Sequence, residues 1–327
     1  MCVYPIFTSA ILTPIVTNSR RIPWLIVASF ATLYLVWGST YLAVKYAVES
    51  FPPFLMCAAR FIAAGSILYT FGLFQRWPRP TFTQWKYALL MGMLFMGSMS
   101  SVAWAEQYVD SSLAALIITS EPGLIVLLLW IFKRQPPSLQ GLVGLVLGVA
   151  GMLVLVGPSL ESLGESRSSA IIIIFLAALA WSVGSVYPAH NKLPSLPTQS
   201  IAMQMLISGV VLLGFSGITE NWTTFSVSAV ESVAWISWGF LVLFGSVLAF
   251  SAFNYLLRVE SPDKVVTFAY VNPVIAVLLG WLFRGETLTM VTGMAALLLL
   301  TGVFLISTRR TLITFPTKWR RLAKKSA

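Results

Sequence analysis

Long apolar stretches without charged residues recur along the whole chain, and they constrain its fold more than any other feature. Of the 327 residues, 57% are hydrophobic and only 10% are charged. The longest charge-free stretches cover residues 22–44, 87–105, 135–160, 168–189, 193–219, 232–257, 265–283 and 287–308. Most reach the roughly 20 residues that a helix needs to cross a hydrocarbon core of about 30 Å. Because they are uniformly apolar rather than alternating, the sequence predicts an all-α integral membrane protein.

The stretches and the short links between them predict ten transmembrane helices. These cover residues 23–45, 54–74, 86–106, 112–132, 138–157, 169–189, 199–218, 233–256, 264–283 and 288–307. With the N-terminus in the cytoplasm, all of the 21 Lys and Arg residues except Lys45, Arg60, Arg167 and Arg284 fall in cytoplasmic segments. This bias predicts a multi-pass protein of the plasma (inner) membrane with both termini in the cytoplasm.

A pair of helix-breaking prolines indicates that the chain is duplicated. Glu121-Pro122 lies inside the fourth span, and Asn272-Pro273 lies inside the ninth, 151 residues later. The residues that follow match at the same offset, as Gly151 and Gly302 do. With five spans in each half, the second half starts on the opposite side of the membrane, so the sequence predicts two inverted five-helix repeats. Broken helices in such repeats commonly build a transport site.

The predicted organisation has five parts. Residues 1–22 form a cytoplasmic N-terminal extension, 23–157 the first repeat, 158–168 an extracytoplasmic linker, 169–308 the second repeat, and 309–327 a basic cytoplasmic tail. The net charge of +10 is spread over short loops and this tail, which favours membrane orientation over nucleic-acid binding. Two cysteines and one histidine predict no disulfide framework, no metal site and no cofactor. The sequence has no GxxxxGKS/T loop, which excludes a primary ATP-driven pump in this chain.

Several short motifs resemble a known family. They are the run WGSTYLAVK at 37–45, PPF at 52–54, RF at 60–61, the proline at 122, NP at 272–273 and GE at 285–286. Over residues 24–308 the chain resembles EamA-type carriers of the drug/metabolite transporter superfamily. The resemblance implies a ten-helix, inverted-repeat carrier, usually an exporter of small metabolites. Many relatives have an uncharged residue before the fourth-span proline, so Glu121 departs from the pattern and is the candidate marker of a subgroup.

Glu121 is the leading candidate for transport chemistry. It lies about nine residues into its span, near the bilayer midplane, where a charge costs some 2.5 kcal/mol or more. The carboxyl group must therefore be neutral, paired or in a wet cavity. One interpretation makes it a proton-coupling or amine-binding group. The alternative is a structural partner for another buried polar group, or a protonated acid bonded to backbone that Pro122 leaves free.

Arg60 is the second charged residue inside a span. It lies about 9 Å from the outer surface by helical rise, and its guanidinium suits a substrate carboxylate. Two structural alternatives remain open and are favoured by position. Arg60 can pair with Glu121 or Glu49, or it can extend to the outer interface.

Asn272 occupies the midplane position in the ninth span that corresponds to Glu121. Its amide suits a neutral polar group of a substrate, and the alternative is a hydrogen bond between helices. Tyr270 and Thr119 precede the two prolines at matching positions and are expected to line the same cavity. Trp37 and Trp181 lie deep in their spans, away from the interfaces where aromatic belts form. They are candidates for a cavity wall or for core packing, and Trp104 is open between the cavity and the interface.

The sequence therefore predicts a secondary active transporter, an exporter of small metabolites such as amino acids, amines or related amphipathic compounds. It would work by alternating access through a midplane cavity, coupled to protons or another ion. The alternatives are a membrane sensor or structural protein, and, less favoured, an integral-membrane enzyme. A glycine stripe that includes Gly144 and Gly148 favours close packing within the bundle over a homodimer seam, leaving monomer and homodimer both open.

Overall fold

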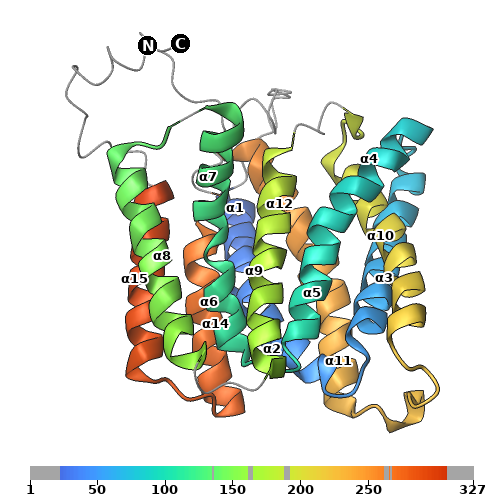
Figure 1. Cartoon of the computed structure of the whole chain (residues 1–327). Coiled ribbons are helices and arrows are strands. Elements are labelled where there is room, and N and C mark those ends of the chain that lie inside the picture. The colour runs from blue at the N-terminus through green and yellow to red at the C-terminus, as the bar shows by residue number, and fades with distance from the viewer. Residues whose placement is uncertain are drawn as a thin grey trace, which may run out of the picture.

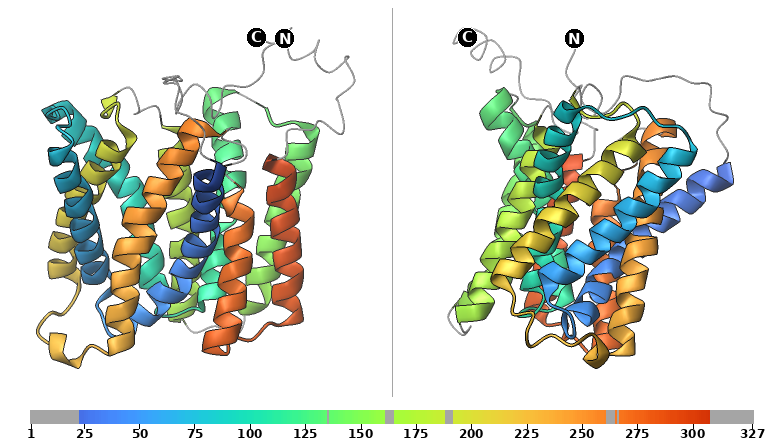
Figure 2. Two further views of the ribbon diagram at one scale, coloured as in Figure 1. Left: turned by 180° about the vertical axis from the view of Figure 1, so that it is seen from behind. Right: turned by 90° about the vertical axis from the view of Figure 1, so that its right-hand side faces the viewer.

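The computed structural model describes residues 23–134, 136–160, 165–187, 192–260, 265 and 267–307. These residues form a bundle of helices that run side by side along one axis (Figures 1 and 2). Within this part of the chain every regular element is a helix. The predicted all-α membrane fold is confirmed, since seven helical spans are long and apolar enough to cross a bilayer.

Four of the seven long spans combine shorter helical segments, and the other three are single helices. The first contains α1 (Pro23–Ala31), η1 (Thr32–Trp37) and α2 (Gly38–Val48), and the second is α3 (Pro53–Phe74). The third contains α4 (Phe82–Gly92), η2 (Met93–Gly97) and α5 (Ser98–Ala105), and the fourth contains α6 (Ser111–Ile118) and α7 (Glu121–Lys133). The others are α9 (Glu165–Val186), α10 (Pro197–Thr219), and α11 (Ser232–Phe240) with η5 (Leu241–Leu248) and α12 (Ala249–Val259).

Three further helices have shorter apolar segments. They are α8 (Leu139–Leu160), α14 (Phe268–Arg284) and α15 (Met290–Ser307). Each coincides with one of the ten predicted spans, but because their apolar segments are short, the count of ten remains a prediction. Helix occupies both ends of the predicted linker 158–168, since α8 continues to Leu160 and α9 begins at Glu165. The predicted extension 1–22 and tail 309–327 lie outside the described residues.

The two ends of the bundle differ in charge. The α3–α4 and α7–α8 connections lie at the same end of the bundle, the top in Figure 1. The segments at this end include Arg76, Arg79, Lys86, Lys133 and Lys192. We call this the basic end. The α2–α3, α10–α11 and α14–α15 connections meet at the opposite end, and the segments there include Glu49, Glu106, Asp110, Glu220, Glu231 and Glu286. We call this the acidic end.

Glycines allow two pairs of helices to approach closely. A Cβ atom at Gly144 would lie 2.6 Å from the Gly302 carbonyl oxygen, so α8 and α15 pack backbone against backbone. Gly65 and Gly209 do the same for α3 and α10, because a Cβ at Gly65 would lie 2.9 Å from the Leu206 nitrogen. The glycine stripe of α8 thus serves contacts within the chain.

Candidate functional site

The fourth span is interrupted two residues before Pro122. Thr119 and Ser120 form a turn between α6 and α7, with Thr119 N donating to Leu116 O at 3.2 Å and Ser120 N to Ile117 O at 3.0 Å. Pro122 is the second residue of α7, a position where a proline is tolerated because its missing N–H has no partner within the helix. The α6 helix therefore ends at this turn, and α7 starts again inside the membrane with Glu121 as its first residue.

The Glu121 carboxylate makes no hydrogen bond or ion pair with the residues that the structure describes. The contact at this residue is through its backbone, where its carbonyl oxygen accepts a bond from Ser182 Oγ at 3.3 Å. The Tyr41 hydroxyl lies within electrostatic range of the Glu121 carboxylate and of the Glu106 carboxylate. A carboxyl group at a helix break without a fixed partner is free to exchange a proton or to bind a cationic group of a ligand.

Asn272 lies in a different environment from Glu121. The α14 helix runs through Pro273 without interruption. Turned so that Nδ2 faces the surrounding oxygens, the Asn272 amide points at the carbonyls of Phe268 (3.2 Å), Leu33 (3.1 Å) and Tyr34 (3.3 Å). Two of these belong to η1, so the amide joins α14 to the first span. This geometry favours a structural role for Asn272 over the binding of a substrate.

Thr119 and Trp104 make contacts within the protein. Thr119 is 4% exposed, and its hydroxyl donates to the Leu116 carbonyl of its own span at 2.5 Å. The Trp104 ring lies 5.0 Å from that of Tyr108, near the acidic end. Tyr270 belongs to α14, and its side chain lies outside the described residues.

The two deep tryptophans pack in separate aromatic clusters. Trp37 contacts Phe250, Phe253 and Phe268 with ring centroids 4.9 to 5.5 Å apart, and its Nε1 donates to the Gly245 carbonyl at 3.2 Å. Trp181 packs edge-on against Phe95 at 4.7 Å. Each tryptophan therefore contacts a span that contains a π-helical segment.

Three π-helical segments widen the spans near their middles. They are η1, η2 and η5. Shifted by 151 residues, η2 falls on 244–248, inside η5, so the two segments occupy matching positions. Wide turns of this kind frequently mark functional sites in helices. Sequence reasoning did not identify these segments. The 151-residue offset that relates the two prolines, applied to the third span, was the signal that could have linked η2 to η5.

Arg60 is buried within the bundle rather than extended to the surface. Its side chain is 1% exposed, its Nε donates to Ser246 Oγ at 2.9 Å, and its Nη2 has no hydrogen-bond partner. Arg60 pairs with neither Glu49 nor Glu121, the two partners considered from the sequence. Glu49 pairs with Arg284 instead, and no bond joins Arg60 to Glu121. Sequence reasoning did not identify Ser246 and Gly245 of η5 as its neighbours.

Two carboxylates cap helices at the acidic end. Gly285 ends α14 in the left-handed region, with φ 65°, and the chain then turns back so that Glu286 reaches the start of α6. There, Glu286 accepts bonds from Ser111 N (3.0 Å), Ser111 Oγ (2.7 Å) and Ser112 N (3.0 Å). Glu220 similarly accepts from Phe54 N and Leu55 N at the start of α3. Negative charge at a helix N-terminus is stabilising, so these carboxylates are structural.

Glu106 contrasts with these capping residues. Its side chain is fully buried at the acidic end, and neither carboxylate oxygen has a hydrogen-bond partner. Burial raises the pKa of Glu106 well above its usual range, and nearby Glu286 adds to the shift while Lys45 opposes it. Lys45 itself donates to the carbonyls of Glu106 and Val109 at 2.6 and 2.9 Å. Within the described residues no group of three or more His, Cys, Asp or Glu is arranged to hold a metal ion.

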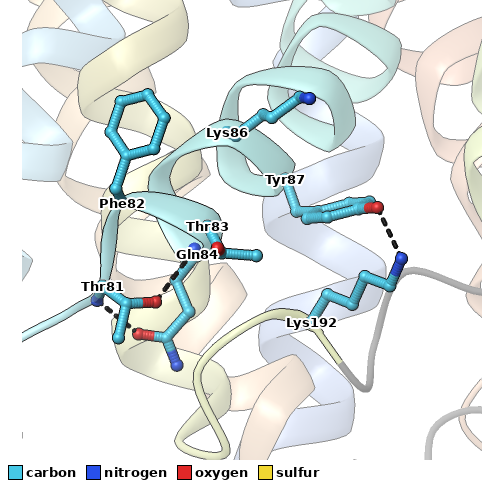
Figure 3. A pocket seen from close by; sticks show the side chains of 7 residues that line it. All are labelled: Thr81, Phe82, Thr83, Gln84, Lys86, Tyr87 and Lys192. Atoms are coloured by element: carbon cyan, nitrogen blue, oxygen red, sulfur yellow. Dashed lines mark hydrogen bonds between the residues drawn. The ribbon is translucent and has the colours of Figure 1, made fainter.

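A surface crevice of about 560 Å³ lies at the basic end, around the start of α4 (Figure 3). It is lined by Thr81, Phe82, Thr83, Gln84, Lys86, Tyr87 and Lys192. Thr81 and Gln84 bond each other's backbone and cap α4, and Lys192 Nζ lies 2.6 Å from the Tyr87 hydroxyl oxygen. None of the predicted site residues lines this crevice, so it is separate from the helix break.

Comparisons with known proteins agree with this architecture. The chain matches the EamA-like transporter family over residues 22–157 and again over 168–308. It is 35% identical over 290 residues to the uncharacterized inner membrane transporter YedA of Escherichia coli, covering 88% of this chain and 91% of that protein. It is 25% identical to the uncharacterized transporter YoaV of Bacillus subtilis, covering 83% and 92%. A crystal structure of another protein shares the fold with a TM-score of 0.61 at 20% identity, covering 86% of this chain and 97% of that one.

Proposed function

The chain belongs to the EamA-like transporter family, and on that premise we propose that it is a secondary active exporter of small metabolites. Relatives that cover most of the chain are named as transporters, and YedA is named as an inner membrane protein. These names support a transporter rather than an enzyme, and they support the plasma (inner) membrane as its location.

Glu121 is the observation that carries the proposal. A carboxylate inside a bilayer is costly unless it is neutral or has a partner, and that of Glu121 has no bonding partner in the described structure. It stands where α7 begins, beside the turn at Thr119 and Ser120. We assign Glu121 the role of coupling residue, which binds a proton on one side of the membrane and releases it on the other as cargo moves in the opposite direction.

The duplication supports alternating access. The two family matches divide the chain into segments of similar length, and η2 and η5 occupy corresponding positions in them. If the two segments are inverted repeats, rocking one against the other exposes a midplane site to each side in turn. The concentration of basic residues in the segments at one end supports cytoplasmic termini, and export would then run outward from that end.

The test compares Glu121→Gln with wild type in proteoliposomes, using a cargo identified by an efflux screen of a metabolite panel in overexpressing cells. We expect Glu121→Gln to lose proton-driven accumulation by at least about tenfold while keeping cargo exchange without a gradient, because exchange needs no net proton movement. The control is Glu231→Gln, which changes an exposed carboxylate that makes no capping bond.

Two outcomes would contradict the proposal. Wild-type proton-driven flux in Glu121→Gln would remove its coupling role. A chain that moves no compound of the panel but signals on ligand binding would be a sensor instead.

A further inference from the structure

We propose that Arg60 is a buried binding site for a single negative charge, and that it holds the carboxylate of a small monocarboxylate cargo. The inference rests on the proposed function, because it assigns this charge to the molecule that the protein carries. It goes further by naming the chemical group that the cargo must have.

Arg60 is a cation buried deep in the bundle, and its guanidinium lies over the Phe61 ring, 5.2 Å from the ring centroid. It lies seven residues after the start of α3, about 10 Å along the helix from the acidic end. Arg60 is the largest fully buried side chain in the described structure. Its hydrogen bond goes to Ser246, a neutral hydroxyl, which does not balance a full positive charge.

The carboxylates that could neutralise Arg60 have other partners or other places. Glu49 pairs with Arg284, Glu220 caps α3, and Glu286 caps α6. The unpartnered Glu106 carboxylate makes no bond to Arg60, and the charged side chains that act on it are Lys45 and Glu286. The contacts of the Arg60 guanidinium in the described structure are the Ser246 hydroxyl at 2.9 Å and the Phe61 ring, whose centroid lies 5.2 Å away. Removing a charge from water without a counter-ion is unfavourable, so the site favours the binding of an anion.

The site suits one negative charge rather than two. The site as described offers one guanidinium, whose Nη2 has no hydrogen-bond partner. A phosphate dianion at this position would therefore leave an uncompensated negative charge in the bundle. A guanidinium matches a carboxylate in both charge and planar geometry.

A glycine stands beside the guanidinium. A Cβ atom at Gly245 would lie 3.4 Å from Arg60 Nη2, the nitrogen without a partner, and 3.1 Å from Thr40 Cγ2. Gly245 lies in the π-helical segment η5, next to Ser246. The free donor of Arg60 thus faces a backbone that carries no side chain.

An apolar wall adjoins the charged group. Trp37 Nε1 bonds the Gly245 carbonyl, and the Trp37 ring continues into the cluster with Phe250, Phe253 and Phe268. A cargo with its carboxylate on Arg60 would place an adjoining apolar group against these rings. The arrangement around Arg60 fits a small amphipathic acid.

The test measures binding to the purified full chain by thermal unfolding in detergent, with three acid and amide pairs as probes. The pairs are acetate and acetamide, 3-phenylpropionate and 3-phenylpropionamide, and indole-3-acetate and indole-3-acetamide. We expect at least one acid to raise the unfolding temperature with an affinity at least about tenfold above its amide. Arg60→Gln should abolish this preference and Arg60→Lys should retain part of it, while Arg284→Gln, which breaks the surface pair with Glu49, should leave it unchanged.

Gly245→Ala keeps the proposal testable if Arg60→Gln does not fold. It leaves the guanidinium and Ser246 in place, adds a methyl group 3.4 Å from Nη2, and should weaken acid binding without changing amide binding. Equal affinities for acids and amides, no binding of any acid, or an acid preference that survives in Arg60→Gln would each overturn the proposal.

The binding assay separates this inference from the proposed function. Acid binding through Arg60 without proton-driven flux would contradict the transport mechanism and leave the anion site standing. Flux of amines alone, with no acid bound, would contradict the anion site and leave the transport mechanism standing. Repeating the assay in chloride, nitrate and gluconate salts shows whether an inorganic monoanion competes for Arg60. If chloride binds at Arg60 and none of the acids does, the cargo assignment is wrong.

Discussion

The pairs Glu121-Pro122 and Asn272-Pro273 stand 151 residues apart, and the two regions handle a mid-span proline differently. At the first, the span separates into α6 and α7, and the carboxylate has no bonding partner. At the second, α14 continues through the proline, and the Asn272 amide faces three backbone carbonyls, two of them in η1. The first region leaves an ionisable side chain without a bonding partner, whereas the second joins two spans.

The two regions are also linked to each other. Glu286 directly follows the Gly285 turn at the end of α14, and it caps the first residues of α6. A Cβ atom at Gly280 would lie 2.3 Å from Glu286 Oε2, so a glycine in α14 makes room for this contact. The continuous helix therefore anchors the start of the broken one.

Replacing the prolines should give the largest difference between the regions. A proline inside a helix costs about 3 kcal/mol, so Pro273→Ala should stabilise the protein by up to about that amount by restoring the bond to the Ala269 carbonyl. Pro122→Ala should change stability by less than about 0.5 kcal/mol, because the second position of α7 tolerates proline. Thermal unfolding of the two variants in detergent measures both. A loss of stability in Pro273→Ala would show that the packing of α14 requires the proline.

Glu286→Gln should destabilise the link between the regions. The change removes a charge that accepts three hydrogen bonds at the start of α6, and bonds to charged groups contribute about 1.5–3 kcal/mol. Glu231→Gln is the matched control, because Glu231 precedes α11 without making a side-chain capping bond. Unfolding free energies measured in mixed micelles should fall for the first variant alone. Equal effects would mean that Glu286 does not anchor α6.

The smallest expected difference is between the unfolding free energies of Asn272→Leu and Glu121→Gln. Hydrogen bonds between membrane helices contribute about 0.6 kcal/mol on average and up to about 1.7 kcal/mol. Asn272→Leu should therefore cost about 0.6–1.7 kcal/mol, whereas Glu121→Gln should cost nearly nothing because its carboxylate has no bond to lose. The same unfolding assay tests both. A larger cost for Glu121→Gln would assign the carboxylate a structural partner.

Much of the architecture could be predicted from the sequence because its causes are local. A stretch without charge that is long enough to cross the bilayer must become a helix there, since hydrocarbon offers the backbone no other partner. The resemblance to the EamA family is confirmed, and the mid-span position of Glu121 follows from counting residues. The break at Pro122 and the continuous helix at Pro273 do not follow from the prolines alone, because neighbouring spans decide how each freed carbonyl is satisfied.

The partners of the polar residues were decided by tertiary structure. Arg60 bonds to Ser246 and lies beside Gly245, about 186 residues further along the chain, and Glu286 reaches back 175 residues to Ser111. The sequence by itself determined which polar side chains are in the membrane. Only the packing of the helices decided which of these side chains cap a helix and which bond to another span. Packing also left Glu121 and Arg60 without an opposite charge. The physical reason is that these contacts join residues that no local sequence pattern connects.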